Sequence, residues 1–146
     1  MPFVSVTRLR VRSYFYLPQF VVWALKSSRQ AQHAEGFLGG TMLREARNVF
    51  WTLTLWRDDA AMSAYRTDGA HRVAMPKLLD WCDEASVTHW TQETPGLPTW
   101  AEAHQRLLKQ GKPSKVKHPT PLHLAHQIPA PRPGRIQTPL QPASLR

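Results

Sequence analysis

Residues 48–58 read NVFWTLTLWRD, and this stretch decides the fold. Aromatic residues, valine, leucine and threonine fill nearly every position, which is typical of a β-strand. One alternating set contains Val49 and Trp51, and the other contains Phe50 and Trp56. Because neighbouring side chains of a strand point to opposite faces, both faces carry apolar side chains. We therefore expect a strand that is covered on both faces.

The chain before this strand predicts a strand, a helix and another strand. Residues 3–11 (FVSVTRLRV) alternate with period two, which favours a strand with one more solvated end. Residues 16–34 place Pro18 in a first helical turn and repeat apolar residues at helical spacing. Residues 36–47 (GFLGGTMLREAR) predict a strand weakened by its glycines, with a hairpin turn at Asn48.

The chain after this strand predicts two helical pieces and a last strand. Asp58 or Asp59 is placed to cap a helix through residues 60–66. Residues 70–84 (AHRVAMPKLLDWCDE) predict a helix on both sides of Pro76, which starts a new turn or kinks it. Residues 86–92 (SVTHWTQ) alternate as a strand.

The order of these elements, β-α-β-β-α-β, predicts an α+β protein with the ferredoxin-like fold. Its four-stranded antiparallel sheet carries helices on one face, so the other face needs cover. Since both faces of residues 48–58 are apolar, a homodimer that buries sheet against sheet is the simplest cover. We therefore expect a dimeric α-β barrel built on residues 1–93.

The basic charge of the chain is concentrated in its last third. The formal net charge is +9, but residues 1–93 contribute only +2 and residues 94–146 contribute +7. Residues 94–112 predict one more helix, with Thr99 and Glu102 at capping-box spacing and Gly111 at its end; we expect this helix to dock on the domain through Trp100. Residues 113–146 alternate proline with basic residues and glutamine, which predicts a flexible or disordered tail.

Composition excludes several classes of protein. A single cysteine excludes a disulfide framework and a cysteine-rich zinc site, and no apolar run approaches the ~20 residues of a membrane span. The sequence has no phosphate loop, nucleotide-binding fingerprint or serine-nucleophile motif, and we expect no metal site. Without a recognisable signal peptide, we expect a cytoplasmic protein.

Three stretches resemble a known family. EGFLGG (residues 35–40), VFWTLTLWRDDAAMSAYR (49–66) and the histidine-containing helix that follows are similar to the antibiotic-biosynthesis-monooxygenase group of dimeric α-β barrels. Within that superfamily, AHRVAMPKLLDWCDEASVTHW (70–90) resembles the DUF3291 group of uncharacterised proteins. The sequence resembles spheroidene monooxygenases and haem-degrading monooxygenases more distantly. The resemblance covers about residues 2–93 and implies an oxidoreductase only by analogy, because a shared fold does not transfer a reaction.

The resemblance also implies site residues. Haem-degrading members place an axial histidine on the helix after the third strand, with a tryptophan nearby. Tyr65 stands at the tryptophan position and Met75 at the axial position, whereas His71 lies one helical turn earlier. His71 and Met75 share a helix face because they are four residues apart. Haem is thus a cofactor that the resemblance implies, whereas the residues by themselves predict no cofactor.

The candidate site residues combine the resemblance with residue chemistry. The catalytic candidates are His71, Tyr65 and His89, because a cofactor-independent oxygenase needs a group that deprotonates its substrate. The candidates for the wall of a ligand pocket are aromatic, sulfur-containing or polar residues: Asn48, Trp51, Trp56 and Met75. Each has a structural interpretation as well, in which the histidines are satisfied by hydrogen bonds and the aromatic residues form the core.

Three functions therefore remain open on the sequence. The first is a small monooxygenase-like oxidoreductase that binds an apolar, aromatic or polyene ligand between sheet and helices. The second is a non-catalytic ligand-binding or structural dimer of the same fold. The third is contact with nucleic acid or an acidic partner through the basic tail, by counterion release. The tail lacks the aromatic residues on which single-stranded bases stack, which makes the third function the weakest.

Overall fold

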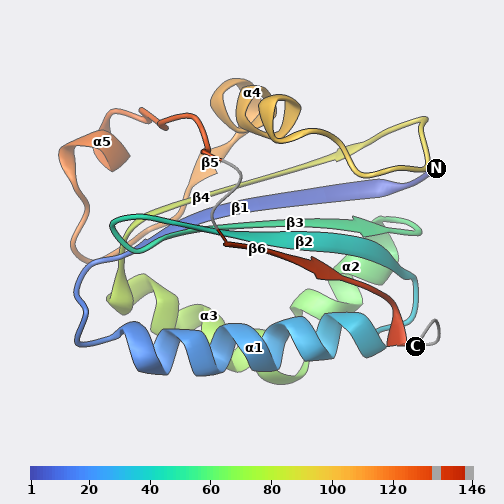
Figure 1. The fold of residues 1–146 in the computed structure, drawn as a ribbon, viewed down its shortest axis with the longest axis horizontal. Coiled ribbons are helices and arrows are strands. Elements are labelled where there is room, and N and C mark those ends of the chain that lie inside the picture. Colours follow the sequence, from blue (N-terminus) through green and yellow to red (C-terminus); the bar gives the residue numbers. More distant parts are fainter. Residues whose placement is uncertain (133–135, 144–146) are drawn as a thin grey trace.

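The computed structural model describes residues 1–132 and 136–143. No helix in these ranges is both long and apolar enough to cross a membrane. The elements, in chain order, are β1 (Phe3–Val11), α1 (Leu17–His33), β2 (Phe37–Glu45), β3 (Val49–Trp56), α2 (Asp59–Arg66), α3 (Gly69–Trp81), β4 (Cys82–Thr91), α4 (Trp100–Gln110), β5 (Lys112–Pro113), α5 (Pro121–Leu124) and β6 (Ile136–Leu140) (Figure 1).

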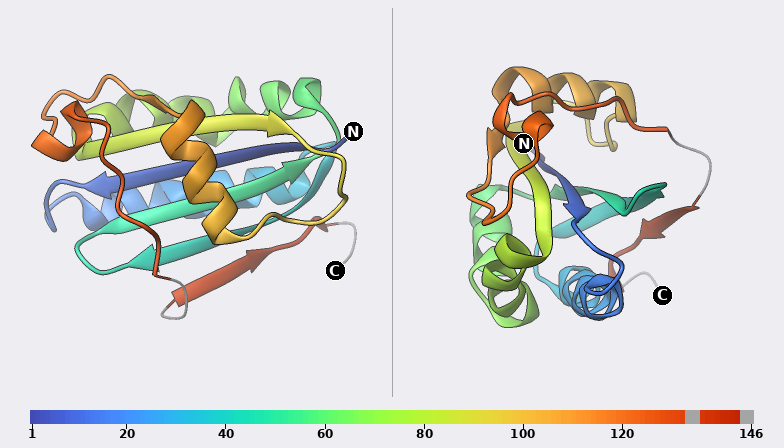
Figure 2. Two further views of the ribbon diagram at one scale, coloured as in Figure 1. Left: turned by 90° about the horizontal axis from the view of Figure 1, so that it is seen from above. Right: turned by 90° about the vertical axis from the view of Figure 1, so that its left-hand side faces the viewer.

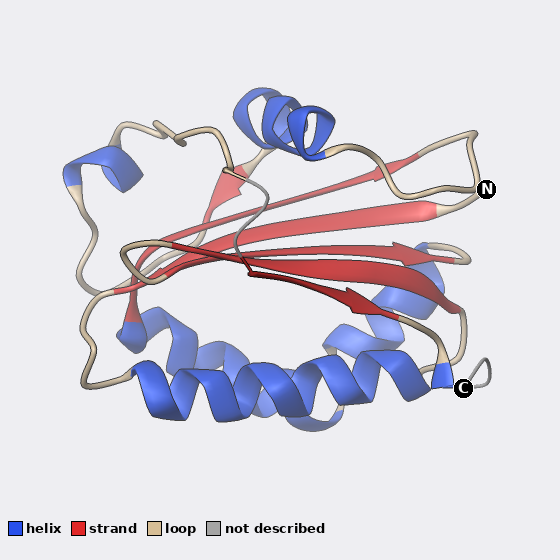
Figure 3. Ribbon diagram, viewed as in Figure 1, coloured by secondary structure: helices blue, strands red, loops and turns tan. Residues whose placement is uncertain are grey.

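The strands form one antiparallel sheet in the order β5-β4-β1-β3-β2-β6. Its four middle strands have the ferredoxin-like order, which confirms the predicted α+β fold class. The sheet has six strands rather than the predicted four, because two short segments of the C-terminal third pair with its edges (Figure 3). Strand β5 pairs with β4, and strand β6 pairs with β2 over Gly40 to Arg44.

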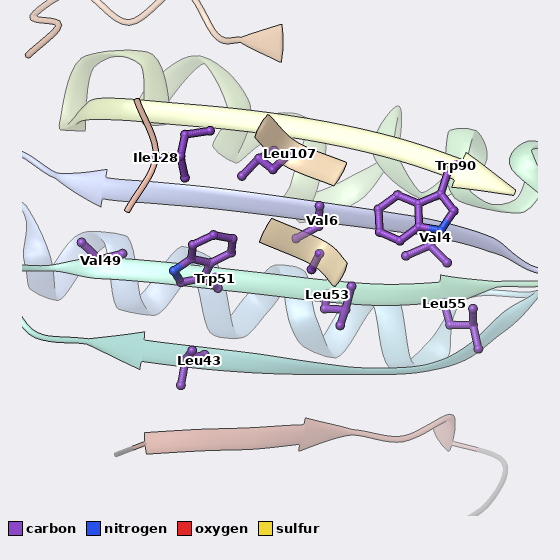
Figure 4. Close-up of a cluster of buried hydrophobic side chains, with 11 residues drawn as sticks. Val4, Val6, Leu43, Val49, Trp51, Leu53, Leu55, Trp90, Leu107 and Ile128 are labelled. Carbon is purple, nitrogen blue, oxygen red and sulfur yellow. The ribbon is translucent and has the colours of Figure 1, made fainter. Parts of the chain in front are cut away.

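Helices cover both faces of the sheet. Helices α1, α2 and α3 lie on one face, and α4 crosses the other (Figures 1 and 2). The face under α4 carries one apolar cluster, to which α4 adds Ala103 and Leu107, both fully buried. The sheet residues of this cluster are Val4, Val6, Leu43, Val49, Trp51, Leu53, Leu55 and Trp90 (Figure 4).

The sequence predicts that a second copy of the chain covers the sheet face opposite α1, α2 and α3. In the structure, α4 of the same chain covers this face. Trp100 of α4 packs edge-on against Trp51 of β3, with 6.0 Å between the ring centroids. The imidazole of His104 hydrogen-bonds through Nε2 to the carbonyl oxygen of Ile128, at 2.7 Å. Ile128 is itself buried in the same cluster. A dimer that packs sheet against sheet would need α4 to leave this face.

The C-terminal segment packs on the domain where the sequence predicts a flexible tail. The backbone N–H groups of Ser114, Lys117 and Thr120 donate to carbonyl oxygens of the domain at 2.9–3.1 Å. Ile128 and Leu140 are buried, 8% and 5% exposed. The described residues of this segment pack because its few apolar side chains are spaced to reach separate apolar surfaces, while its backbone groups find partners between them.

The N-terminal part of β4 differs from the sequence prediction. Residues 82–84 were expected to end the preceding helix, but the strand already begins at Cys82. A β-bulge adds one residue to β4 opposite β1, so that both Asp83 and Glu84 are buried. Arg10 pairs with Asp83 at 2.6 Å, and Arg8 pairs with Glu84 at 2.8 Å. These ion pairs between β1 and β4 hold Asp83 and Glu84 inside the protein. As part of a helix end, which the sequence predicts, both side chains would be exposed to solvent.

Candidate functional site

A cavity of about 430 Å³ lies between the sheet and the layer formed by α1 and α3. It lies on the face of the sheet opposite α4. Most of its lining is apolar, but hydroxyl groups, two histidines and two arginines also border it. Its volume is within the range of small-molecule sites.

The strand register explains which side chains form the floor of this cavity. Because side chains alternate along a strand, every second position of each strand faces the helices. The register aligns these positions into three rows that cross the sheet. From one end of the cavity to the other, the rows are His89–Ser5–Thr54–Leu140, Val87–Thr7–Thr52–Met42–Thr138 and Ala85–Leu9–Phe50–Arg44–Ile136.

The floor is polar at one end and apolar at the other. The first two rows contain a histidine and five hydroxyl side chains, of which Ser5 and Thr54 are buried. The third row is apolar except for Arg44. Phe20 of α1 closes over this apolar end, with its ring centroid 4.6 Å from that of Phe50. A ligand in the cavity therefore meets hydrogen-bonding groups near His89 and apolar surface near Phe50.

His71 lies near the start of α3 and borders the cavity. Its Nδ1 lies 3.2 Å from the backbone carbonyl oxygen of Arg66. A carbonyl oxygen only accepts hydrogen bonds, so Nδ1 holds the proton of the neutral ring and Nε2 carries the free lone pair. Burial lowers the pKa of His71; the hydrogen bond to the Arg66 carbonyl opposes this shift, and the positive charge of the Arg66 side chain adds to it. The imidazole is therefore neutral at pH 7 and able to accept a proton.

Tyr65 lies between His71 and Trp56 and contacts both rings at a tilt. Its ring centroid is 4.7 Å from that of His71 and 5.0 Å from that of Trp56. Its hydroxyl donates to the backbone carbonyl oxygen of Ser27 at 3.2 Å. Burial raises the pKa of Tyr65 well above its usual range, so the phenol stays protonated at neutral pH. Tyr65 therefore orients the imidazole and does not supply a phenolate.

Gln30 fixes the start of α3, a role that sequence patterns do not reveal. Its Nε2 donates to the carbonyl oxygens of Tyr65 (3.1 Å) and Asp68 (2.8 Å), and its Oε1 accepts from the backbone N–H of His71 (2.9 Å). Gly69 has φ +57°, and a Cβ there would meet the Gln30 side chain at 3.0 Å. A glutamine on the polar side of a helix gives no sequence signal for such a clamp.

His89 belongs to the floor, at the same end of the cavity as His71. Its Nε2 is buried and has no hydrogen-bond partner among the described residues. Its ring stacks on Phe3, with 5.7 Å between the centroids. Burial lowers the pKa of His89, with a further lowering from Arg66 that Asp59 partly offsets. An unpartnered buried nitrogen favours the neutral ring, because charge would have no compensation.

The other four candidates divide between the cavity and its surroundings. Met75 borders the cavity and is 38% exposed. Trp51 is among the lining residues, but its ring packs on the α4 face of the sheet. Trp56 is fully buried beside the cavity and donates from Nε1 to Thr54 Oγ1 at 2.9 Å. Asn48 sits at the β2–β3 turn, in a separate hollow, and donates to the carbonyl oxygen of Val11.

The charge of the lining is one-sided. The described lining residues include Arg44 and Arg66 but no aspartate or glutamate. Arg66 lies at the histidine end, and Arg44 lies at the opposite corner of the floor. Such a lining favours an anionic or electron-rich ligand over a cation.

A family model for a domain of unknown function, DUF3291, matches residues 16–118, from the residue before α1 to the segment after β5. The chain belongs to the DUF3291 family. The resemblance seen in the sequence is therefore confirmed. This match spans α1 and α3, which roof the cavity, but it ends before β6, which supplies one edge of the floor. No curated protein matches the DUF3291 chain.

Solved structures share the fold of this DUF3291 protein at low sequence identity. SnoaB, a cofactor-independent oxygenase from Streptomyces nogalater, has a TM-score of 0.54 and 18% identity, over 67% of this chain and 98% of that one. A protein from Nitrosomonas europaea, assigned provisionally to the antibiotic biosynthesis monooxygenases, has a TM-score of 0.57 and 13% identity, over 64% and 92%. A conserved protein from Methanosarcina mazei has a TM-score of 0.56 and 13% identity, over 64% and 94%. The likeness shows a monooxygenase-like fold.

The lining does not fit haem in the way that the resemblance implies. The position expected to carry the axial imidazole is Met75, at the partly exposed border of the cavity. His71 lies one turn earlier than that position, with its ring packed at a tilt against Tyr65. Among the residues that the structure describes, no three His, Cys, Asp or Glu side chains form a metal-binding group either.

Proposed function

We propose that this DUF3291 protein is a small monooxygenase-like oxidoreductase that binds an apolar aromatic or polyene ligand in the cavity. The observation that carries the proposal is the cavity end where His71 and His89, both favouring the neutral ring, meet an apolar volume of about 430 Å³. A neutral imidazole inside an apolar site is a base that works at neutral pH. The fold shared with a cofactor-independent oxygenase supports the same reading.

His71 is the better placed of the two bases. Its Nδ1–H bond to the Arg66 carbonyl leaves Nε2 as the nitrogen that takes a proton from an acidic O–H or C–H group of the ligand. Arg66 lies close enough to lower the pKa of both histidines, and the same positive charge stabilises the anion left on the ligand. The hydroxyl groups of Ser5 and Thr54 line the floor nearby and hold polar edges of the ligand.

The chemistry that follows needs only the ligand and oxygen. An activated CH₂ group that reacts with one O₂ becomes a C=O group and releases one H₂O. The ligand supplies all four electrons, so no external reductant is consumed. The role of the chain is to remove the first proton, to hold the electron-rich anion, and to keep water away from it.

The second candidate is a binding protein without catalysis, in the same cavity. It is favoured by the burial of His89 Nε2, because a ligand would reach this nitrogen only after the ring moved. In this reading His71 and the hydroxyl groups of the floor bind polar edges of the ligand and leave it unchanged. Both candidate functions predict that the protein binds the ligand, but only the oxygenase would also consume oxygen.

The test uses anthrone, an aromatic ketone with an activated CH₂ group, as the probe. We expect the protein to consume oxygen with anthrone and to form anthraquinone, and His71→Asn to slow the reaction by about 100-fold, in line with loss of a general base. The control is His33→Asn on the outer side of α1, where the imidazole bonds to Arg29. Binding of anthrone without oxygen consumption would support the binding protein, and equal rates in both variants would exclude His71 as the base.

A further inference from the structure

We propose that the ligand of this cavity is an elongated apolar carboxylate, whose acidic group pairs with Arg44 at the mouth of the cavity. The inference rests on the proposed function, because it specifies the ligand of the same site. It concerns the corner of the floor that is farthest from the two histidines.

Arg44 is the charged member of the apolar row of the floor. It is paired in register with Phe50 of β3 on one side and with Ile136 of β6 on the other. Its guanidinium lies 5.5 Å from the Phe50 ring centroid, over a ring that itself borders the cavity. The guanidinium therefore stands beside the apolar volume rather than away from it.

The charge of Arg44 is not neutralised by its neighbours. It makes no ion pair or side-chain hydrogen bond with any residue of 1–132 or 136–143. Glu45 is adjacent in sequence, but its two oxygens accept from Trp51 Nε1 and from the backbone N–H of Arg132, both at 2.7 Å. A guanidinium presents several donors in one plane, which suits the two oxygens of a carboxylate.

This corner of the cavity reaches the surface at an exposed side chain. Arg44 is exposed, and both Arg44 and Ile136 border a second hollow as well as the main cavity. Ile136 is 56% exposed. An acidic group placed here stays in contact with water while the apolar body lies inside, which avoids the cost of burying a charge.

The register also sets the shape of the ligand. Arg44 and His89 are separated by two rows along the strands and by three strand spacings across the sheet. These steps correspond to about 13 Å along the strands and about 14 Å across them. A ligand that reaches from Arg44 toward the histidines is therefore long, with its acidic group at one end and its reactive part at the other. Arg66, at the histidine end, is the rival position for the acidic group.

The experiment compares retinoic acid with methyl retinoate, two polyenes that differ in the negative charge. Binding is followed by quenching of tryptophan fluorescence, since Trp23 borders the cavity. We expect the unaltered protein to bind the acid about tenfold more tightly than the ester, as one charge-assisted contact implies. Arg44→Gln should remove this preference, leaving affinity for the ester unchanged, and Arg44→Lys should restore part of it.

Two further variants separate the alternatives. Arg72→Gln changes an exposed arginine of α3 outside the lining and should keep the preference. Arg66→Gln should keep it as well; loss of preference in this variant alone would overturn the assignment to Arg44. Equal binding of acid and ester by the unaltered protein would overturn the inference while leaving the proposed ligand-binding function standing. Failure of both probes to bind would contradict both proposals.

Discussion

At the scale of single residues, the fold holds the two cavity histidines in different ways. His71 has one nitrogen engaged by a backbone carbonyl, whereas the buried Nε2 of His89 has no described partner. The family resemblance, together with the chemistry of imidazole, makes both histidines candidates for a ligand site. The sequence does not predict what sets their protonation, because burial is the largest cause of both lowered pKa values and depends on how the helices pack on the sheet.

We predict that His89 makes the protein less stable in mild acid. Its pKa in the folded state is below the value of about 6.5 of an unfolded chain. Below pH 6.5 the His89 ring therefore binds a proton more readily in the unfolded chain than in the folded protein. The free energy of unfolding falls as the pH falls, because protonation favours the unfolded state. Urea unfolding at pH 7.5, 6.5 and 5.5 measures this fall, and His89→Gln should make it shallower.

The control for this prediction is His33→Gln, because His33 lies on the exposed outer side of α1. This variant should keep the pH dependence of the unaltered protein. His71 has a lowered pKa too, so a residual fall in the His89 variant is expected. An unchanged slope after His89→Gln would show that the buried ring gains its proton without cost.

At the scale of elements, alternation and caps predict the fold well. Strand β1 and the α1 helix follow their patterns, and Asp58 and Thr99 cap α2 and α4 with side-chain hydrogen bonds to Ala61 and Glu102. The start of β4 could not be predicted, since a bulge and two ion pairs to β1 decide it. Which face of β3 lines the cavity was likewise open, because both faces are apolar and α4 decides between them.

We predict that Leu107 contributes strongly to the stability of the whole sheet. Its side chain is fully buried, and it joins α4 to the cluster around Trp51. Leu107→Ala removes that packing and leaves a cavity, so the free energy of unfolding should fall by about 2–4 kcal/mol. Urea unfolding at pH 7 measures the change. Lys109→Ala, on the exposed side of the same helix, is the control. A loss below about 1 kcal/mol would mean that α4 is only loosely docked.

At the scale of the whole molecule, the charge distribution suggests a separate C-terminal segment, whereas the fold joins much of that segment to the domain. Most of the net charge of +9 lies in residues 94–146, which composition separates from the domain. In the structure, parts of that segment cover one face of the sheet and extend both of its edges. The docking of the helix in residues 94–112 was expected, but composition missed the packing of the segment after it. Two well-placed apolar side chains, Ile128 and Leu140, outweigh many prolines and lysines once the sheet offers them apolar surface.

The last prediction separates a docked segment from a free tail. The N–H groups of Lys117 and Thr120 donate to Leu79 and Asp83, and the Thr120 hydroxyl donates to Glu84 Oε2 at 2.8 Å. Amides held in this way exchange with solvent only when the segment opens. We therefore expect hydrogen exchange, followed by mass spectrometry of the full chain, to show protection in residues 114–120.

Thr120→Val should keep the backbone hydrogen bond but weaken the packing of residues 114–120 on the domain, because it leaves one oxygen of buried Glu84 without that donor. Protection in this segment should then fall, while that of β1 stays. Exchange of residues 114–120 at the rate of an unstructured peptide would contradict the docked arrangement and restore the flexible tail.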